Sequence, residues 1–241
     1  MNRLIIIGAS GHGRVVADIA RLNEYKDIVF LDNNSDLKEC AGYPVLGPDI
    51  MTAELDGDIF VAVGNGRIRK KLMERDKGRI FPVLIHPHAV IAADVLIGEG
   101  SVVMAGTVIN GNTEIGRGCI VNTSASVDHD CILGNFVHVS VGAHLCGTVT
   151  VGEDTWIGTG VIVSNNVEIC SDTIIGAGAV IINTIAEEGI YIGVPAKKVD
   201  GDEKVNITDD KVSKIKGSNS GRYSVSCPFV ATYSWQYRKA A

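Results

Sequence analysis

The chain has 241 residues, with 22 Lys and Arg against 28 Asp and Glu, so its formal net charge is −6. That sign gives no electrostatic footprint for nucleic acid or for an anionic membrane surface. Apolar residues make up 46% of the chain, which is enough for a sizeable core and excludes wholesale disorder. No run approaches the roughly 18 consecutive apolar residues of a membrane span, and Leu4–Ile7 is too short for a signal peptide, so we expect a cytoplasmic protein.

The first 85 residues alternate short apolar runs with helical spacing of apolar side chains. In chain order, the predicted elements are a strand at Leu4–Ile7, a helix through residues 15–22, strands at Ile28–Leu31 and Asp58–Val63, and a helix carrying alternating charge from Arg67 to about Lys77. This alternation predicts a Rossmann-like α/β domain with a parallel sheet over residues 1–85.

Glycines and polar residues follow the predicted strands, where such sheets bind ligands. The segment Gly8–Gly13 is followed along the chain by Asp32-Asn33 and by Gly64–Gly66. Its glycines lie in a GxxGxG order, which departs from the dinucleotide fingerprint GxGxxG, and no hydride-transfer site is visible, which argues against NAD. The loop is either a tight strand-to-helix turn or a phosphate site at a helix N-terminus. In the second case, Asp32 is placed to accept hydrogen bonds from a ribose or base.

A period of six residues runs through the second half of the chain. Every sixth residue from Ile91 to Ile181, 16 positions in all, is Ile, Val or Leu. The residue four positions after each is mostly small or β-branched, and Gly often follows the aliphatic position. This pattern is typical of a hexapeptide-repeat parallel β-helix, in which three hexapeptides make one coil and residues 18 apart stack. We assign this domain to residues 86–200.

Residues 201–241 lie outside the repeat. Residues 201–221 are charged and rich in Ser, Asn and Gly, which indicates a linker, and residues 222–237 are aromatic. The aromatic segment is compatible with two strands, a partner-binding segment or disorder. The six cysteines form no CxxC pair, which argues against a zinc ribbon, and we interpret them as reduced and mostly buried.

His129 is the leading candidate for chemistry. It is third in its hexapeptide, at a corner, so it is expected to point away from the aliphatic core, and an imidazole suits proton transfer near neutral pH. The alternative is a histidine satisfied within the core. His138 and His144 are sixth in their hexapeptides and are compatible with plain surface positions. A metal site formed by the three histidines is conceivable, but acyl transfer from a thioester needs no metal, and we expect none.

The two halves together resemble a known family. The chain carries GASGHGRVVADIA near its start, VGNGRIRKKL after the third predicted strand, VDHDCILGNFVHVSVGAHLCG in the repeat and Gly-Val-Pro-Ala-Lys at 193–197. Over about residues 2–199 it is similar to the NeuD/PglD family of bacterial sugar acyltransferases. This resemblance implies a left-handed β-helix, acetyl-CoA as co-substrate, a homotrimer with sites between neighbouring prisms, and an acceptor that is a nucleotide-linked 4-amino-sugar or a sialic acid.

The resemblance also implies roles for individual residues. The catalytic histidine corresponds to His129, and the neighbouring Asp130, which is Glu in some relatives, raises its basicity. Positions that match contacts with acetyl-CoA are His138, Thr159, Ala177 and the terminal-turn residues Gly193, Pro195 and Lys197. Positions that match contacts with the sugar nucleotide are Ser10, Gly11, His12, Asp32, Asn33, Gly64 and Arg67, the last replacing an acidic residue of some relatives.

These observations lead to an expected reaction and its rivals. We expect His129 to deprotonate a sugar amine as the amine attacks acetyl-CoA, with no acyl-enzyme, because Cys131 is fifth in its hexapeptide and is expected to face inward. O-acetylation of a sialic acid or another sugar hydroxyl is the alternative, since one base serves both. A non-catalytic module that binds sugar nucleotides is a weaker alternative because it has no need of His129 and Asp130. A purely structural β-helix has no need of the glycine loop or residues 193–197.

Overall fold

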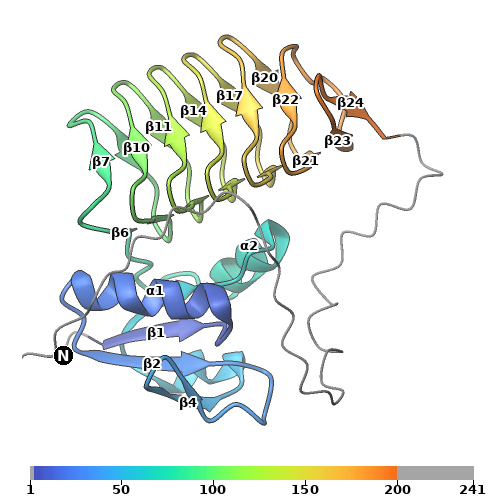
Figure 1. Cartoon of the computed structure of the whole chain (residues 1–241). Helices are drawn as coiled ribbons and strands as arrows, with labels where there is room; N and C mark the ends of the chain where they lie inside the picture. The colour runs from blue at the N-terminus through green and yellow to red at the C-terminus, as the bar shows by residue number, and fades with distance from the viewer. Residues whose placement is uncertain (1–2, 200–241) are drawn as a thin grey trace, which may run out of the picture. The chain divides into compact units, whose positions relative to one another are not determined.

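The first region of the protein is an α/β layer. The computed structural model describes residues 3–199 of the chain (Figure 1). The elements of the first region are β1 Arg3–Ile7, α1 Gly11–Leu22, β2 Asp27–Leu31, β3 Glu39–Cys40, β4 Tyr43–Gly47, a 3-10 helix Asp49–Glu54, β5 Asp58–Val61 and α2 Gly66–Arg75. The tail interpreted as a linker and an aromatic segment, residues 201–241, lies outside the described residues.

The sheet of this region has the strand order β3-β4-β2-β1-β5. Strands β2, β1 and β5 are parallel, with Ile5 opposite both Val29 and Ile59. All three central strands are buried on both sides, which explains why they are continuous apolar runs. The parallel α/β layer predicted from the sequence is therefore confirmed.

Several elements of this region differ from the predicted ones, mostly by one or two residues at their ends. Helix α1 begins at Gly11, inside the glycine loop, because Ser10 is its N-cap. Strand β5 ends at Val61, two residues before the predicted end. Strand β4 was not predicted, because Tyr43–Gly47 is half-buried at most positions and contains a proline and a glycine, so it lacks a strong strand pattern.

The second region is a parallel β-helix with three faces, built from strands of two residues at six-residue intervals. Face 1 is the eight-stranded sheet, of β6 Leu84–Ile85, β9 Val102–Val103, β12 Ile120–Val121, β15 His138–Val139, β18 Trp156–Ile157, β21 Ile174–Ile175, β23 Ile190–Ile192 and β24 Lys197–Lys198. Face 2 is the six-stranded sheet, of β7 Val90–Ile91, β10 Val108–Ile109, β13 Ser126–Val127, β16 His144–Leu145, β19 Ile162–Val163 and β22 Val180–Ile181. Face 3 is the five-stranded sheet, of β8 Leu96–Ile97, β11 Glu114–Ile115, β14 Ile132–Leu133, β17 Thr150–Val151 and β20 Glu168–Ile169.

The hexapeptide register explains how this prism is filled. Residues 18 apart pair between neighbouring coils, as Val121 does with Val139. The second residue of each strand points inward, so the aliphatic column that includes Val127, Leu133 and Val139 forms the core. The first residue of each strand points outward. The β-helix predicted from the period is confirmed, and strand β6 at Leu84–Ile85 already belongs to face 1.

Face 1 is covered by the α/β region. Its outward residues Leu84, Val102 and Ile120 are buried in one cluster with residues of α1 and β1. At the corner between faces 3 and 1, Phe136 packs with Met73 of α2. Because the α/β region occupies face 1, the corner between faces 2 and 3 lies on the opposite edge of the prism.

Candidate functional site

His129 lies at the corner between faces 2 and 3, between β13 and β14. Its side chain is 57% exposed, and its Nδ1 lies 2.6 Å from Oδ2 of Asp130. Asp130 adopts φ +59°, the left-handed conformation that turns the chain at this corner. The tight turn thus presents an imidazole and a carboxylate side by side on the surface of the prism.

Two further contacts define the position of His129. Its backbone N–H donates to Oδ1 of Asp128 at 2.9 Å. On the next coil, Gly147 lies beneath the ring, because a Cβ there would come 2.6 Å from Nε2. At position 147, only a glycine leaves room for the His129 imidazole. The ring is therefore fixed by its neighbours along the chain and by the coil that follows.

The charges around His129 favour its protonated form. The hydrogen bond that His129 donates to the Asp130 carboxylate raises the pKa of His129 above its usual value, and the negative charge of Asp128 adds to this. The pKa of Asp130 is lowered, first by a hydrogen bond from Asn112 and then by the one from His129. A histidine with a raised pKa is a stronger base, which suits it to accept a proton from an amine or a hydroxyl.

The glycine loop joins β1 to α1. Gly8 has φ +107°, and a Cβ on Gly13 would come 2.1 Å from the Gly8 carbonyl oxygen, so both positions require glycine. Ser10 is the N-cap of α1 but its side chain makes no capping hydrogen bond, and the first turn holds no acidic residue. The positive end of the α1 dipole therefore has neither a side-chain cap nor an acidic residue of its first turn beside it.

Asp32 and Asn33 at the end of β2 hold the loops in place. Asp32 accepts the backbone N–H of Ala9 on Oδ2 and that of Asn34 on Oδ1, both at 2.8 Å. Asn33 donates to Oδ2 of Asp49 at 2.7 Å. Asp32 therefore ties the glycine loop to the neighbouring strand. The sequence pattern placed it at the ligand edge but did not reveal this bond.

His138 lies on face 1 beneath the loop that follows β5. It is only 9% exposed, its ring stacks on Trp156 with centroids 5.4 Å apart, and Asn122 Nδ2 lies 3.3 Å from its Nε2. Its Nδ1 is buried without a hydrogen-bond partner, as is Nε2 of His12. The plain surface position considered for His138 therefore does not hold.

Burial keeps both of these histidines neutral. Desolvation lowers the pKa of His138 to about 3, with the charge of Arg69 adding to the effect. The same two causes lower the pKa of His12 to about 4. The sequence assigned His138 to acetyl-CoA and His12 to the sugar nucleotide, but the structure places the two imidazoles close enough to affect each other's charge.

Helix α2 connects the loop after β5 to the corner between faces 3 and 1 through basic side chains. Arg67 pairs with Asp172 at 2.7 Å and Lys70 with Glu153 at 2.5 Å. Arg69 is 1% exposed and donates to four backbone carbonyls, those of Val63, Gly64, Gly118 and Phe136, at 2.7 to 2.9 Å. The alternating charge seen in the sequence of this helix did not single out Arg69, whose burial depends on the packing of α2 against the prism.

A cavity of about 180 Å³ opens between the first turn of α2 and face 1. Gly64, Arg67, His138 and Trp156 are among the residues that line it. Two of the predicted acceptor positions and one predicted coenzyme position therefore lie around one hollow.

The other predicted coenzyme positions gather at the corner between faces 1 and 2. Thr159 and Ala177 are 18 residues apart and lie there on successive coils, and the Gly178 N–H donates to the Thr159 carbonyl at 2.8 Å. The turn from Gly193 to Lys197 joins β23 to β24, and the Gly193 carbonyl accepts the Val180 N–H at 3.1 Å. These positions form a continuous exposed edge, separated from His129 of the same chain by the width of face 2.

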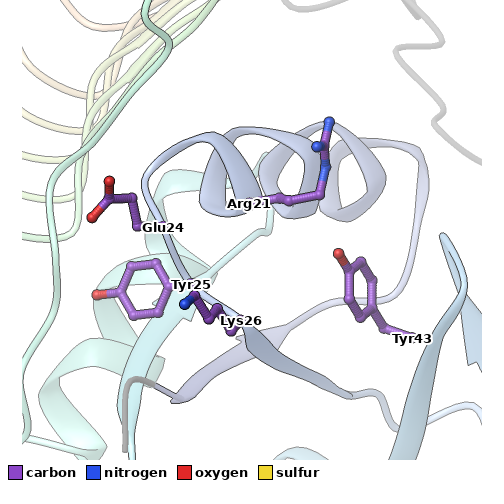
Figure 2. Close-up of a pocket in the computed structure, with 5 residues that line it drawn as sticks. All are labelled: Arg21, Glu24, Tyr25, Lys26 and Tyr43. Atoms are coloured by element: carbon purple, nitrogen blue, oxygen red, sulfur yellow. The ribbon is translucent and has the colours of Figure 1, made fainter.

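A larger hollow of about 760 Å³ lies at the other end of α1 and is shown in Figure 2. Arg21, Glu24, Tyr25, Lys26 and Tyr43 line it. The Tyr25 hydroxyl donates to Asp58 Oδ2 at 2.6 Å. No residue singled out in the sequence lines this hollow.

The three histidines considered for a metal site do not converge. His129 lies at the corner of faces 2 and 3, His138 on face 1, and His144 on face 2, where its Nδ1 lies 2.8 Å from Ser126 Oγ. Within residues 3–199, no group of three His, Cys, Asp or Glu side chains is placed to hold a metal ion. The same part of the chain contains no helix of the length and apolarity needed to cross a membrane.

Two family profiles match the chain. The PglD N-terminal domain matches residues 3–75, and the bacterial transferase hexapeptide, six repeats, matches residues 148–183. A UDP-N-acetylbacillosamine N-acetyltransferase of Bacillus subtilis is 34% identical over 113 residues, which are 44% of this chain. The matched region spans 52% of that protein, so the chain covers about half the length of this curated relative.

Solved structures extend the similarity to both regions. The acetyltransferase domain of PglB from Neisseria gonorrhoeae is 44% identical, with a TM-score of 0.80 over 83% of this chain and 100% of that one, and it is also known in complex with acetyl coenzyme A. PerB from Caulobacter crescentus, in complex with CoA and GDP-perosamine, is 38% identical, with a TM-score of 0.77 over 83% of this chain and 98% of that one.

Proposed function

Because the chain belongs to the family of hexapeptide-repeat sugar acetyltransferases that carry a PglD N-terminal domain, we propose that it acetylates the amine of a nucleotide-linked 4-amino-sugar with acetyl-CoA. The names of its relatives support this proposal: one acts on UDP-N-acetylbacillosamine, and another is solved with CoA and GDP-perosamine. The observation that carries it is the exposed His129–Asp130 pair at 2.6 Å, the arrangement of a general base and its orienting carboxylate.

His129 is the proposed general base. When the Nδ1–H of His129 donates a hydrogen bond to the Asp130 carboxylate, Nε2 carries the lone pair and is free to accept a proton. The sugar nitrogen attacks the acetyl carbonyl carbon and loses one proton to His129. The carbon–sulfur bond then breaks, and the protonated His129 gives that proton to the leaving sulfur, so that CoA departs as its thiol and His129 is neutral again. Asp130 orients the ring and stabilises its charged form.

Direct transfer is proposed because the thiol that follows the His129–Asp130 pair in the chain is unsuited to attack. Cys131, one residue past the pair, is fully buried, and burial raises the pKa of its thiol. A thiol with a raised pKa holds little thiolate, which is the nucleophilic form. Holding amine and thioester together removes much of the entropic barrier instead.

The two substrates are proposed to bind at different edges of the chain. The N-terminus of α1, where the Ser10 side chain makes no capping hydrogen bond, is proposed to hold the acceptor's phosphates, with His12 in its first turn and Asp32 and Asn33 at the end of the neighbouring β2. Gly64 and Arg67 at the α2 cavity are proposed as further contacts with the acceptor. The edge formed by Thr159, Ala177 and residues 193–197 is proposed to hold acetyl-CoA, with His138 buried nearby on face 1.

A homotrimer would bring these parts together. Within one chain, the α/β region covers face 1, whereas His129 lies at the opposite corner, so one chain alone keeps acceptor and base apart. The outward strand positions of face 2 include exposed Val90, Val108 and Ile162 and no Asp, Glu, Lys or Arg, whereas those of face 3 include Glu114 and Glu168 beside exposed Leu96 and Ile132. We therefore propose face 2 as the surface that packs against neighbouring copies.

Mixing two inactive variants tests a shared site. His129→Ala removes the base, and Ser10→Asp places a carboxylate where the phosphate would bind. If each site uses His129 of one chain and the α1 N-terminus of another, trimers reassembled from equal amounts should recover about a quarter of wild-type activity by random pairing. Recovery of no activity from reassembled mixed trimers, or sedimentation as a monomer at micromolar concentration, would contradict the proposal.

The acceptor is identified by a turnover screen. CoA release is measured with acetyl-CoA and a panel of UDP-, GDP- and dTDP-linked 4-amino-sugars, alongside free and CMP-linked sialic acids. The proposal expects turnover with an amino-sugar nucleotide and none with the same sugar nucleotide bearing a hydroxyl at C4. Turnover with sialic acids alone would replace N-acetylation by O-acetylation.

A further inference from the structure

Three residues at the same corner of successive coils form a chain of hydrogen bonds that ends at His129. They are Asp94, Asn112 and Asp130, each 18 residues after the last, so the β-helix stacks them. Asp94 Oδ2 accepts the Asn112 N–H at 3.0 Å, and Asn112 Nδ2 donates to Asp130 Oδ1 at 2.6 Å. Asp130 Oδ2 in turn lies 2.6 Å from His129 Nδ1.

Asn112 occupies one oxygen of Asp130 and so leaves the other for His129. The carboxylate side chain is 46% exposed, and without Asn112 it is held only by His129 and by its own backbone, whose N–H donates to the Gly111 carbonyl at 3.1 Å. An exposed carboxylate with one partner rotates among rotamers and exchanges with water. A second, charge-assisted hydrogen bond on the opposite oxygen fixes its plane.

We propose that Asn112 is a positioning residue that locks the Asp130 carboxylate in the orientation needed to hold the His129 imidazole as a base. The proposal rests on the proposed role of His129 and adds a residue one coil away that touches neither substrate nor reacting atom. The carboxamide matters because it supplies a donor without a charge, whereas a carboxylate at this position would repel Asp130.

The charged groups that face His129 are Asp130 and Asp128, and Gly147 covers the ring from the next coil. Asn112 is the first cause of the lowered pKa of Asp130, and Asp130 is the first cause of the raised pKa of His129. Loss of Asn112 therefore lets the pKa of His129 fall toward its usual value, because the Asp130 carboxylate is no longer held against Nδ1.

Asn112→Gly is the matched substitution, because Asn112 has φ +54°, which glycine adopts without strain. Asn166→Gly is the control: Asn166 has φ +59° at the same kind of corner three coils on, away from Asp130. We measure kcat and KM for both substrates, and the pKa of His129 by NMR titration of its imidazole.

We expect Asn112→Gly to lower kcat about three- to tenfold with little change in either KM, and to lower the pKa of His129, while Asn166→Gly changes neither. Equal kcat and equal His129 pKa in the two variants would overturn the proposal and leave Asn112 a structural corner residue. If the wild type turns over no acceptor, the proposed function fails, but the titration still decides whether Asn112 holds the pair.

Discussion

Replacing Arg69 by methionine would remove the side chain that joins α2 to the prism. Its guanidinium donates to the carbonyls of Val63, Gly64, Gly118 and Phe136, so it ties the loop after β5 to two coils of the β-helix. Burial lowers its pKa to about 10, which leaves it protonated at neutral pH. Methionine has a similar length and can fill the space but donates nothing.

The expected loss follows from these four bonds. A hydrogen bond to a charged group contributes about 1.5 to 3 kcal/mol, but the cost of burying the guanidinium offsets a large part of the sum. Each buried carbonyl left without a donor costs about 1 to 3 kcal/mol, so after this offset we expect a net loss of about 3 to 5 kcal/mol. For a chain of this size that corresponds to a fall in melting temperature of roughly 6 to 20 °C.

The assay is thermal unfolding at fixed protein concentration, because association changes apparent stability. Arg69→Lys retains a charge and fewer donors and should melt between the wild type and Arg69→Met. Lys71→Met, on the exposed side of the same helix, is the control and should change stability by less than about 0.5 kcal/mol. The expected difference in melting temperature is well above about 2 °C. If Arg69→Met melts within about 2 °C of Lys71→Met, the four hydrogen bonds do not stabilise the junction between α2 and the prism.

Three further results are expected. Gly147→Ala places a Cβ 2.6 Å from the His129 ring and should lower kcat about tenfold or more by displacing the imidazole. The melting temperature should stay unchanged. A variant with the wild-type kcat would show that catalysis tolerates this displacement of the ring. Because the pKa of His129 is raised above 6.5, kcat/KM should rise with pH through a midpoint above that value, and a midpoint below it would contradict the pairing with Asp130. Because the pKa of His138 is lowered to about 3, the unfolded chain binds more protons than the folded chain below pH 6.5. The free energy of unfolding should therefore fall by about 2 kcal/mol from this residue on acidification to pH 5. His138→Phe should lose less stability between pH 7 and 5 than the wild type, and an equal loss would show that His138 is not the cause.

The hexapeptide period predicted the prism well because each position of the repeat has a fixed place in it, in the core, on a face or at a corner. Val127 and Val139 fall in the aliphatic register and are core residues, whereas His129 falls at a corner and is exposed. Such a repeat depends on contacts between residues 18 apart, which the sequence displays directly. Asp130 follows His129 directly in the chain, so the sequence also predicted that the two side chains lie at the same corner.

Other parts of the candidate site depend on contacts that no period encodes. Arg69 looks like one more charge on α2 until the fold places that helix against face 1. The stacking of His138 on Trp156 is a pairing 18 residues apart, but its burial comes from the α/β region, which follows a different pattern. The bond from Asp32 to Ala9 likewise requires the order of β1 and β2 in the sheet.

The central claim is that His129 is the general base of an acetyl transfer. Its most direct test is kcat of His129→Ala with acetyl-CoA and the acceptor found in the screen, beside His88→Ala, an exposed histidine near the start of the prism, as the control. General-base catalysis contributes about 10²- to 10⁴-fold, so kcat of His129→Ala should fall by that factor while His88→Ala and the melting temperatures stay unchanged. Retention of more than about a tenth of wild-type kcat, well above the lower end of that range, would show that His129 is not the base.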